Sequence, residues 1–230
     1  MTTIEARDSV VEASLAYDEF ATRYDGLLTE NRINAYMRRE MTRTLLSTFE
    51  PGSRLVELGC GTGKNTALLA EIGERVRAVD FSPSMIERAK DKLRLNNVSF
   101  EVADITEPWP CASDSYDLIV CNLVLEHIRD LPFIFAEAFR VLVTQGRFFL
   151  CELHPTRQYE GKQASFLRNG KMTAIEAFVH HLTDFTDAAY DCGFSLQSMK
   201  EWWHEEDRNK SPRLVSFMFE KRPTQSELGH

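Results

Sequence analysis

Residues 56–63, VELGCGTG, constrain the fold of this chain more than any other stretch. They end a short apolar run that begins at Ser53 and is typical of a buried strand, and they precede residues 64–70, which favour a helix. A strand that passes through a glycine-rich turn into a helix presents bare main-chain N–H groups at the carboxyl end of a sheet. Because glycine has no Cβ, a ligand can approach such a turn closely. The pattern therefore predicts a nucleotide-type site.

The spacing of the glycines distinguishes between classes of nucleotide. A dinucleotide-binding turn has a third glycine three positions after the second, and Lys64 stands at that position. An acidic residue two positions before the first glycine suits a ligand with an ammonium group and no phosphate, such as S-adenosylmethionine. The alternative is a chance glycine-rich turn in an ordinary α/β domain. The pattern resembles motif I of class I S-adenosylmethionine-dependent methyltransferases at Glu57, Gly59, Gly61 and Gly63, with Cys60 inside the turn.

Further apolar runs predict the rest of a parallel sheet, joined by right-handed crossovers. Two late strand-like runs, 194–203 and 213–219, follow a helix that we expect Thr183 and Asp184 to cap. The resemblance implies an α/β, Rossmann-like fold: a seven-stranded, mostly parallel sheet with an antiparallel closing strand, N-terminal helices and a cap insert after strand five. The remaining strands are expected at 75–80, 98–102, 115–122 and 146–153.

We expect a single methyltransferase domain with five sections. The first is a helical lid with helices at about 4–24 and 31–49, whose Tyr17 and Tyr24 are candidates for contact with the substrate and the cofactor, respectively. The alternative is that these helices only cover an exposed sheet face. The sections are the lid (1–50), a cofactor-binding core (51–154), a substrate cap insert (155–181), a C-terminal helix with a β-hairpin (182–221) and a tail (222–230).

Polar residues that end the predicted strands are the candidate cofactor ligands. Asp80 lies 19 positions after Gly61, and a carboxylate at the tip of strand two can accept hydrogen bonds from both ribose hydroxyls. The alternative for Asp80 is an acid at a helix N-terminus, although Ser82 already provides that cap. Phe81 and Met85 are candidates for contact with the adenine ring. The resemblance further implies adenine contacts from Asp104 and Ile105, and contacts to the methionine part from Asn122 and Leu123.

The insert after strand five contains candidate substrate ligands, and four histidines are candidate bases. Arg157 can pair with a substrate carboxylate, and an exposed loop of ordinary polar composition is the alternative. An oxygen nucleophile needs a base, for which histidine titrates in the right range, whereas a neutral amine or an activated carbon needs none. A lone histidine is more often structural. The candidate catalytic residues are His127 and His154, and the candidate substrate-binding residues of the insert are Arg157, Tyr159, His180 and His181.

Bulk properties exclude several classes of protein. A formal charge of −8 disfavours a nucleic-acid partner, whose phosphates need clustered Lys and Arg. We expect no membrane span, because no apolar run approaches the required length. The start of the sequence does not resemble a signal peptide. Five cysteines without a CxxC pair favour neither a disulfide framework nor a metal site, so we expect a cytoplasmic protein.

The sequence therefore predicts an enzyme that transfers a methyl group from S-adenosylmethionine to an O, N or C nucleophile of a small molecule and leaves S-adenosylhomocysteine. The sequence has a general likeness to ubiquinone-biosynthesis-type methyltransferases. Because members of this branch act on many substrates, the sequence does not predict the acceptor. One alternative is a non-catalytic protein of the same fold that binds a cofactor or a partner. Another alternative is an NAD(P)-dependent oxidoreductase. The third glycine expected in such an enzyme is absent from this chain, which has Lys64 at that position. No oligomeric state is predicted.

Overall fold

The computed structural model describes residues 52–161, 165–168, 171–203 and 209–223, with the side chains of 165–168 and 171–174 left out. The two N-terminal helices of the predicted lid, and with them Tyr17 and Tyr24, lie outside the described residues.

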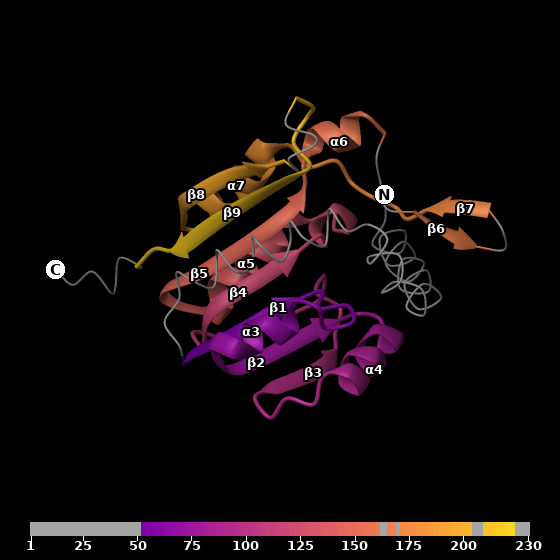
Figure 1. Cartoon of the computed structure of the whole chain (residues 1–230). Helices are drawn as coiled ribbons and strands as arrows, with labels where there is room; N and C mark the ends of the chain where they lie inside the picture. The colour runs from indigo at the N-terminus through magenta and orange to yellow at the C-terminus, as the bar shows by residue number, and fades with distance from the viewer. Residues whose placement is uncertain (1–51, 162–164, 169–170, 204–208, 224–230) are drawn as a thin grey trace.

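The described chain contains the predicted seven-stranded mixed sheet, in the order β3-β2-β1-β4-β5-β9-β8 (Figure 1). The first five strands along the chain pair in parallel, and β9 runs antiparallel between β5 and β8, which confirms the predicted closing strand. The strands are β1 (Ser53–Leu58), β2 (Gly73–Asp80), β3 (Val98–Val102), β4 (Tyr116–Asn122), β5 (Leu142–Leu153), β8 (Phe194–Trp202) and β9 (Leu214–Lys221).

Helices cover both faces of the sheet. Apolar side chains of α5 and α7 pack with one face of the central strands, whereas α3 and α4 pack on the other. Among the described residues no helix is both long and apolar enough to span a bilayer. The helices are α3 (Thr66–Ile72), α4 (Pro83–Lys92), the 3₁₀ turn η1 (Leu125–His127), α5 (Leu131–Val141), α6 (Pro155–Tyr159) and α7 (Leu182–Asp191).

The starts of these helices follow from their capping residues. The Ser82 hydroxyl accepts a hydrogen bond from the Met85 N–H at 3.1 Å, and Pro83 occupies the first helical position of α4. The predicted cap of α7 is confirmed for Asp184 and wrong for Thr183. His181 is the N-cap residue, and Asp184 is the third helical residue, whose carboxylate accepts from the His181 N–H at 2.7 Å. This reciprocal arrangement is a capping box, so the helix begins one residue earlier than Thr183.

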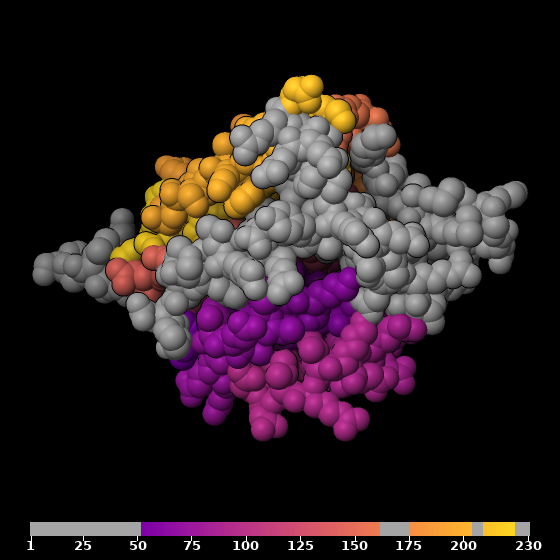
Figure 2. Space-filling model, in the orientation of Figure 1, coloured from indigo at the N-terminus to yellow at the C-terminus, as the bar shows by residue number. Residues whose placement is uncertain are grey.

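The insert that follows β5 contains α6 and a two-stranded ribbon, β6 (Ser165–Arg168) and β7 (Lys171–Ala174). In Figure 1 the ribbon projects away from the sheet. In the space-filling view (Figure 2), the chain from β1 to β3 forms the lower part of the molecule, and the C-terminal segments form the upper part.

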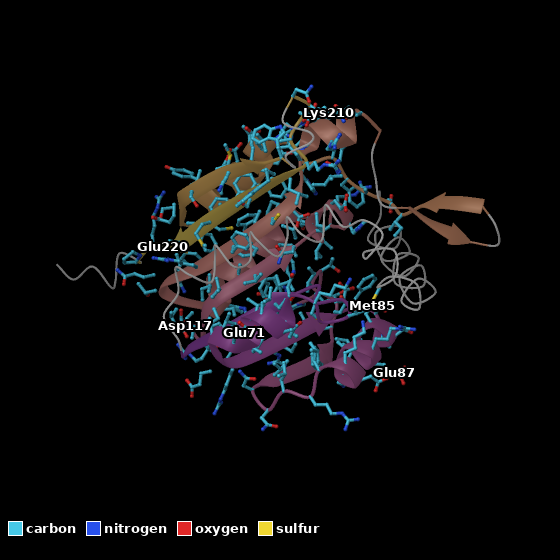
Figure 3. All side chains as sticks on the ribbon, in the orientation of Figure 1. Glu71, Met85, Glu87, Asp117, Lys210 and Glu220 are labelled. Atoms are coloured by element: carbon cyan, nitrogen blue, oxygen red, sulfur yellow. The ribbon has the colours of Figure 1, made fainter. Side chains whose placement is uncertain are left out.

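The strand order reverses between β1 and β4, and this reversal opens a crevice at the carboxyl ends of the strands. Met85 lies near that edge of the sheet and Asp117, at the start of β4, lies near the opposite edge (Figure 3). The glycine loop after β1 and the polar residues that end β2 and β4, Asp80 and Asn122, are thereby brought around one opening.

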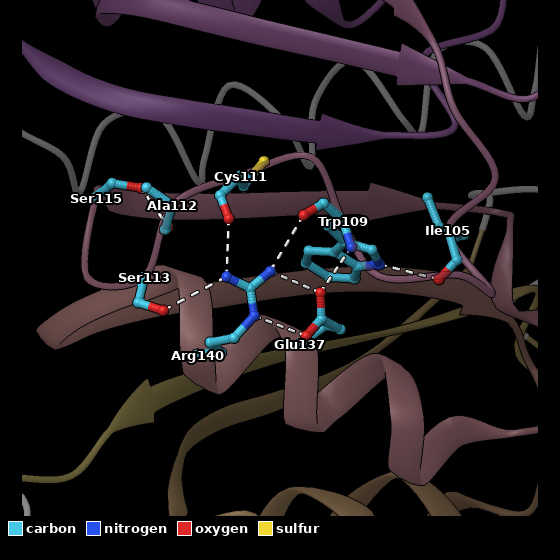
Figure 4. A network of polar contacts seen from close by, with 8 residues as sticks. All are labelled: Ile105, Trp109, Cys111, Ala112, Ser113, Ser115, Glu137 and Arg140. Atoms are coloured by element: carbon cyan, nitrogen blue, oxygen red, sulfur yellow. Dashed lines mark hydrogen bonds and ion pairs between the residues drawn. The ribbon is translucent and has the colours of Figure 1, made fainter.

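The long loop after β3 is fastened to α5 by hydrogen bonds to the two side chains of an ion pair on that helix (Figure 4). Arg140 pairs with Glu137 at 2.7 Å and donates to the carbonyl oxygens of Trp109 and Cys111. Trp109 donates through its main-chain N–H to Glu137 and through its indole N–H to the Ile105 carbonyl oxygen. The network therefore fixes the loop whose first residues face the crevice.

We predict that Arg140→Met lowers the free energy of unfolding by about 1–3 kcal/mol, because carbonyl oxygens of the loop lose a charged donor. Arg54→Met is the matched control, since the half-exposed Arg54 guanidinium donates to the Asp117 carboxylate rather than to carbonyl oxygens of a loop. Urea unfolding measures both variants. Equal losses in the two variants would contradict a special role for the Arg140 network.

Candidate functional site

The glycine loop between β1 and α3 has left-handed backbone at all three glycines, with φ of +66° at Gly59, +54° at Gly61 and +82° at Gly63. A Cβ at Gly59 would overlap the side chain of Val124, which follows β4. A Cβ at Gly63 would lie 2.6 Å from Leu93 Cδ1. Gly59 and Gly61 line the crevice, whereas Gly63 permits close packing against the end of α4.

Asp80 fastens the glycine loop to the tip of β2. Its Oδ2 accepts a hydrogen bond from the Gly61 N–H at 2.8 Å, and its Oδ1 accepts from the Ser82 N–H at 2.9 Å. The residue is 6% exposed and lines the pocket. A carboxylate oxygen can accept more than one hydrogen bond, so a carboxylate in the pocket lining is suited to a ligand with hydroxyl groups.

The pocket at the carboxyl ends of β1, β2 and β4 has a volume of about 760 Å³ including its open mouth. Asp104 belongs to this lining, and its Oδ1 accepts from the Thr106 N–H at 2.8 Å and the Thr106 hydroxyl at 2.7 Å, which orients the carboxylate. Most of the predicted cofactor residues line it: Gly59, Gly61, Asp80, Phe81, Met85, Asp104, Ile105, Asn122 and Leu123, together with Ala103, Val124, His127 and Ile128.

The end of β4 has two features that the sequence does not reveal. Leu123 has φ of +57°, an uncommon conformation for a branched side chain, and its N–H donates to the Cys151 carbonyl oxygen at 2.8 Å. The Asn122 side-chain nitrogen is buried and has no hydrogen-bond partner. Strained backbone and an unsatisfied donor at the wall of one pocket are features of ligand sites.

Glu57 precedes the glycine loop and Cys60 is part of it, and neither belongs to the pocket lining. Glu57 is 2% exposed and accepts a hydrogen bond from the Thr66 hydroxyl. Burial, with a smaller contribution from the nearby charge of Asp80, raises the pKa of Glu57 to about 8. Burial also raises the pKa of the Cys60 thiol, so this thiol is not a reactive thiolate. Cofactor contact by Glu57, Cys60 and Gly63 stays a prediction.

A second buried carboxyl, Glu152 at the end of β5, supports the segment after β4. Its Oε1 accepts hydrogen bonds from the N–H groups of Val124 and Leu125, each at 3.2 Å. Burial, and then the charge of Glu126, raises the pKa of Glu152 to about 8. Sequence reasoning missed this residue, although an acid that ends an otherwise apolar strand was a usable signal.

His127 ends η1 and lines the pocket. Its Nδ1 lies 2.8 Å from the Glu176 carbonyl oxygen. A carbonyl oxygen only accepts hydrogen bonds, so Nδ1 bears the hydrogen in the neutral ring and Nε2 holds the lone pair. Nε2 lies 3.7 Å from Glu126 Oε1. His127 is therefore a ring with a fixed tautomer, placed between the pocket and a buried carboxyl.

The last part of the insert, residues 175–180, lies against η1, and we call it the strap. The Phe178 N–H donates to the Glu126 carbonyl oxygen at 2.6 Å. His180 is 9% exposed, and its Nε2 donates to the Ile128 carbonyl oxygen at 2.7 Å. His180 thus fastens the strap to the segment that lines the pocket, and it does not itself line the pocket.

The other predicted residues of the insert lie away from the pocket lining. His154 is 4% exposed, its Nδ1 accepts from the Thr156 N–H at 3.3 Å, and its Nε2 lies 3.0 Å from Glu201 Oε1. Burial lowers the pKa of His154, which caps α6. Arg157 lies 3.5 Å from Glu160, and the Tyr159 hydroxyl bonds to His181 Nδ1. Their predicted roles in catalysis and substrate binding stay predictions.

We predict that Glu152→Gln makes stability less dependent on pH. A carboxyl with a usual pKa of 4.5 that titrates near 8 when folded stays protonated in the folded state while the unfolded chain ionises. Stability therefore falls as pH rises from about 4.5 to about 8, by about 1.4 kcal/mol per pH unit for each such group. Glutamine still accepts hydrogen bonds from the Val124 and Leu125 N–H groups. The stability of the variant should therefore fall less steeply with rising pH than that of the wild type, and Glu57 should account for the fall that remains.

Chemical denaturation at pH 5, 6, 7 and 8 measures this slope. Glu160→Gln is the control, because Glu160 is exposed. Parallel stability curves for Glu152→Gln and the wild type would contradict the burial of a neutral carboxyl.

Comparison with known proteins identifies the family. Residues 56–150 match the family model described as "Methyltransferase domain". A demethylmenaquinone methyltransferase of Beutenbergia cavernae is 32% identical over 190 residues, which cover 81% of this chain and 74% of the relative. A malonyl-[acyl-carrier protein] O-methyltransferase of Bacillus cytotoxicus is 29% identical over 175 residues, covering 73% of this chain and 55% of the relative. The chain spans only 28% of a longer relative, the biotin biosynthesis bifunctional protein BioHC of Saccharophagus degradans.

The fold agrees with these relatives. The crystal structure of a putative S-adenosylmethionine-dependent methyltransferase from Listeria monocytogenes superposes with a TM-score of 0.68 at 20% identity, covering 79% of this chain and 98% of the other. These similarities favour a methyltransferase over the oxidoreductase and the non-catalytic alternatives. The chain belongs to the class I S-adenosylmethionine-dependent methyltransferases and is an enzyme of that kind.

Proposed function

We propose that this enzyme methylates a small organic acceptor that must lose a proton, with His127 as the base. The observation on which the proposal rests is the position of His127: it lines the same pocket as the cofactor candidates, and its tautomer leaves Nε2 able to accept a proton.

The five cysteines are free, which supports a reducing cytoplasm as the location of the protein.

The residues of the pocket fit S-adenosylmethionine. The carboxylate of Asp80 in the pocket lining suits the two ribose hydroxyls, and the second oxygen of Asp104 suits the adenine amino group between the apolar surfaces of Ile105 and Met85. The unpaired Asn122 side-chain nitrogen offers a donor for the cofactor's carboxylate. When bound, the cofactor supplies a methyl group activated by its positively charged sulfur.

The part of this chain in the reaction is positioning and proton removal. The pocket walls from β1 and β4 hold the reacting groups in line, which can contribute a large part of the rate. His127 Nε2 accepts the acceptor's proton, and the Glu176 carbonyl oxygen holds the opposite ring nitrogen in its donor form. The strap keeps the ring in place, because it is bonded to η1 at Phe178 and His180.

A base next to the pocket favours one class of acceptor. A carboxylic acid is already ionised at neutral pH and needs no base, whereas an aromatic hydroxyl with a pKa near 10 does. We therefore propose an acceptor with an aromatic or enolic hydroxyl, methylated on oxygen or on an adjacent activated carbon. The two relatives act on demethylmenaquinone and on malonyl-[acyl-carrier protein], so a dihydroxynaphthalene and a malonyl thioester are suitable contrasting probes.

We predict that Asp80→Asn weakens S-adenosylmethionine binding about 10- to 100-fold, because charge-assisted hydrogen bonds to the ribose are lost. The binding of S-adenosylhomocysteine should weaken by the same factor, since this ligand has the same ribose. Isothermal titration measures both affinities, with exposed Asp91→Asn on α4 as the control. Unchanged affinity in a folded Asp80→Asn protein would contradict the assignment.

We predict that His127→Gln lowers kcat with a hydroxyl acceptor about 10²- to 10⁴-fold, the usual range for loss of a general base. Affinity for S-adenosylmethionine should change by less than about threefold, because the pocket walls remain. Methylation of the dihydroxynaphthalene and of the malonyl thioester is measured in parallel, with exposed Asp91→Asn on α4 as the control. Wild-type turnover of the malonyl probe alone would overturn the proposed acceptor class.

A further inference from the structure

Two carboxyl side chains, Glu126 and Glu152, are buried directly behind the wall that contains His127. Glu126 is 9% exposed and Glu152 is 2% exposed. The Oε2 atom of each is buried and has no hydrogen-bond partner. A buried ionised carboxylate without a partner is strongly unfavourable, and such groups respond by holding a proton.

The two carboxyls differ in what they contact. Glu152 uses Oε1 to hold the N–H groups of Val124 and Leu125, so it positions the start of η1. Glu126 Oε1 instead lies 3.7 Å from His127 Nε2, the nitrogen that accepts the substrate proton in the proposed function. Glu126 is therefore placed to receive a proton from that nitrogen after a small movement of the ring.

The titratable and charged groups near Glu126 come from several elements. Within the described parts of the chain, the only cationic or ionisable nitrogen that pairs with its carboxyl is His127. Burial raises the pKa of Glu126, and His127 lowers it. The titratable or charged groups of the neighbouring elements are Glu152 from β5, Cys121 from β4, Arg129 after η1, Glu176 and His180 from the strap, and Asp80 and Asp104 in the pocket lining.

A positively charged ligand in this pocket shifts the equilibrium between the protonated and the ionised form of Glu126. The cofactor is a cation at sulfur before methyl transfer and is neutral there afterwards. An opposite charge nearby favours the ionised carboxyl, and its loss favours the protonated one. Both cofactor forms have the same amino acid and ribose, so groups that respond only to those parts cannot distinguish them.

We propose that Glu126 gives up its proton when S-adenosylmethionine binds and takes up the acceptor's proton, through His127, as the methyl group is transferred. This inference rests on the proposed function for the second half of the cycle, whereas the first half concerns cofactor binding alone. Glu126 is thus the final proton acceptor, and Glu152 is a positioning residue.

Atoms and charges balance in this scheme. The acceptor's X–H bond breaks, its proton passes to His127 Nε2, and from there to Glu126 Oε1. The electron pair left on the acceptor forms the new bond to carbon, while the sulfur–carbon bond breaks and its electron pair stays on the sulfur. The site loses the positive charge of the sulfonium and the negative charge of Glu126 together. No net charge is left behind in a poorly solvated region.

The test counts protons released on binding, without any acceptor present. Isothermal titration at pH 7 in buffers of different ionisation enthalpy gives the number of protons released by S-adenosylmethionine and by S-adenosylhomocysteine. For the wild type we expect the first ligand to release more, by about half to one proton. In Glu126→Gln the difference should disappear. Glu126→Asp, which keeps an acid, should restore at least part of it.

Two further variants identify the source of the proton. Glu57→Gln should keep the difference between the ligands, because both present the same ammonium group. Glu152→Gln should also keep it, since glutamine preserves the acceptor for η1. Equal proton release by the two ligands in the wild type, or an unchanged difference in Glu126→Gln, would overturn the proposal.

A measurement on the unmodified enzyme covers the case in which Glu126→Gln does not fold. Infrared spectroscopy with ¹³C-labelled glutamate should show loss of a protonated carboxyl band when S-adenosylmethionine, but not S-adenosylhomocysteine, is added. The same band after both ligands would contradict the proposal. Because neither experiment needs turnover, an inactive enzyme with normal proton release would overturn only the proposed acceptor or base.

Discussion

The close approach of the glycine loop to the end of β4 is the constraint on which the site depends. A side chain at Gly59 would overlap Val124, so the loop reaches the segment after β4 only because a Cβ is missing. Glu152 holds that segment from the other side through the Val124 and Leu125 N–H groups. Two walls of the pocket, one from β1 and one from β4, are therefore fixed against each other before a ligand binds.

The parts of the molecule that depend on local pattern were predictable. The glycine loop, Asp80 and the strand at 98–102 follow from residues that are neighbours in sequence, and β3 has the predicted bounds. β5 begins at Leu142, earlier than the expected residue 146, because Tyr116 pairs with Leu142 across a shift in register. Such an irregularity depends on the partner strand, and the apolar pattern of one strand does not reveal it.

The parts that depend on distant contacts were not predictable. Of the two carboxyls behind His127, Glu152 comes from β5, about 25 positions later in the chain. The strap bonds to η1 and to Ile128 from residues about fifty positions later. Histidine composition suggested His154 as readily as His127. Contacts distinguish them, since His154 is occupied as the cap of α6 by Thr156 and Glu201, whereas His127 faces the pocket. The left-handed Leu123 likewise follows from the tertiary fold alone.

The many carboxyl groups around the pocket can be related to the change of charge that the ligand undergoes. If Asp80, Asp104 and the carboxyls behind the walls were all ionised, their mutual repulsion would destabilise the folded protein without ligand. Burial keeps part of this charge neutral, as the raised pKa values of Glu57 and Glu152 indicate. On the proposed cycle, a cation that enters the pocket generates its own counter-charge at Glu126, and that charge disappears when the sulfur becomes neutral. The product then lacks an attraction that the substrate form had, which favours its release.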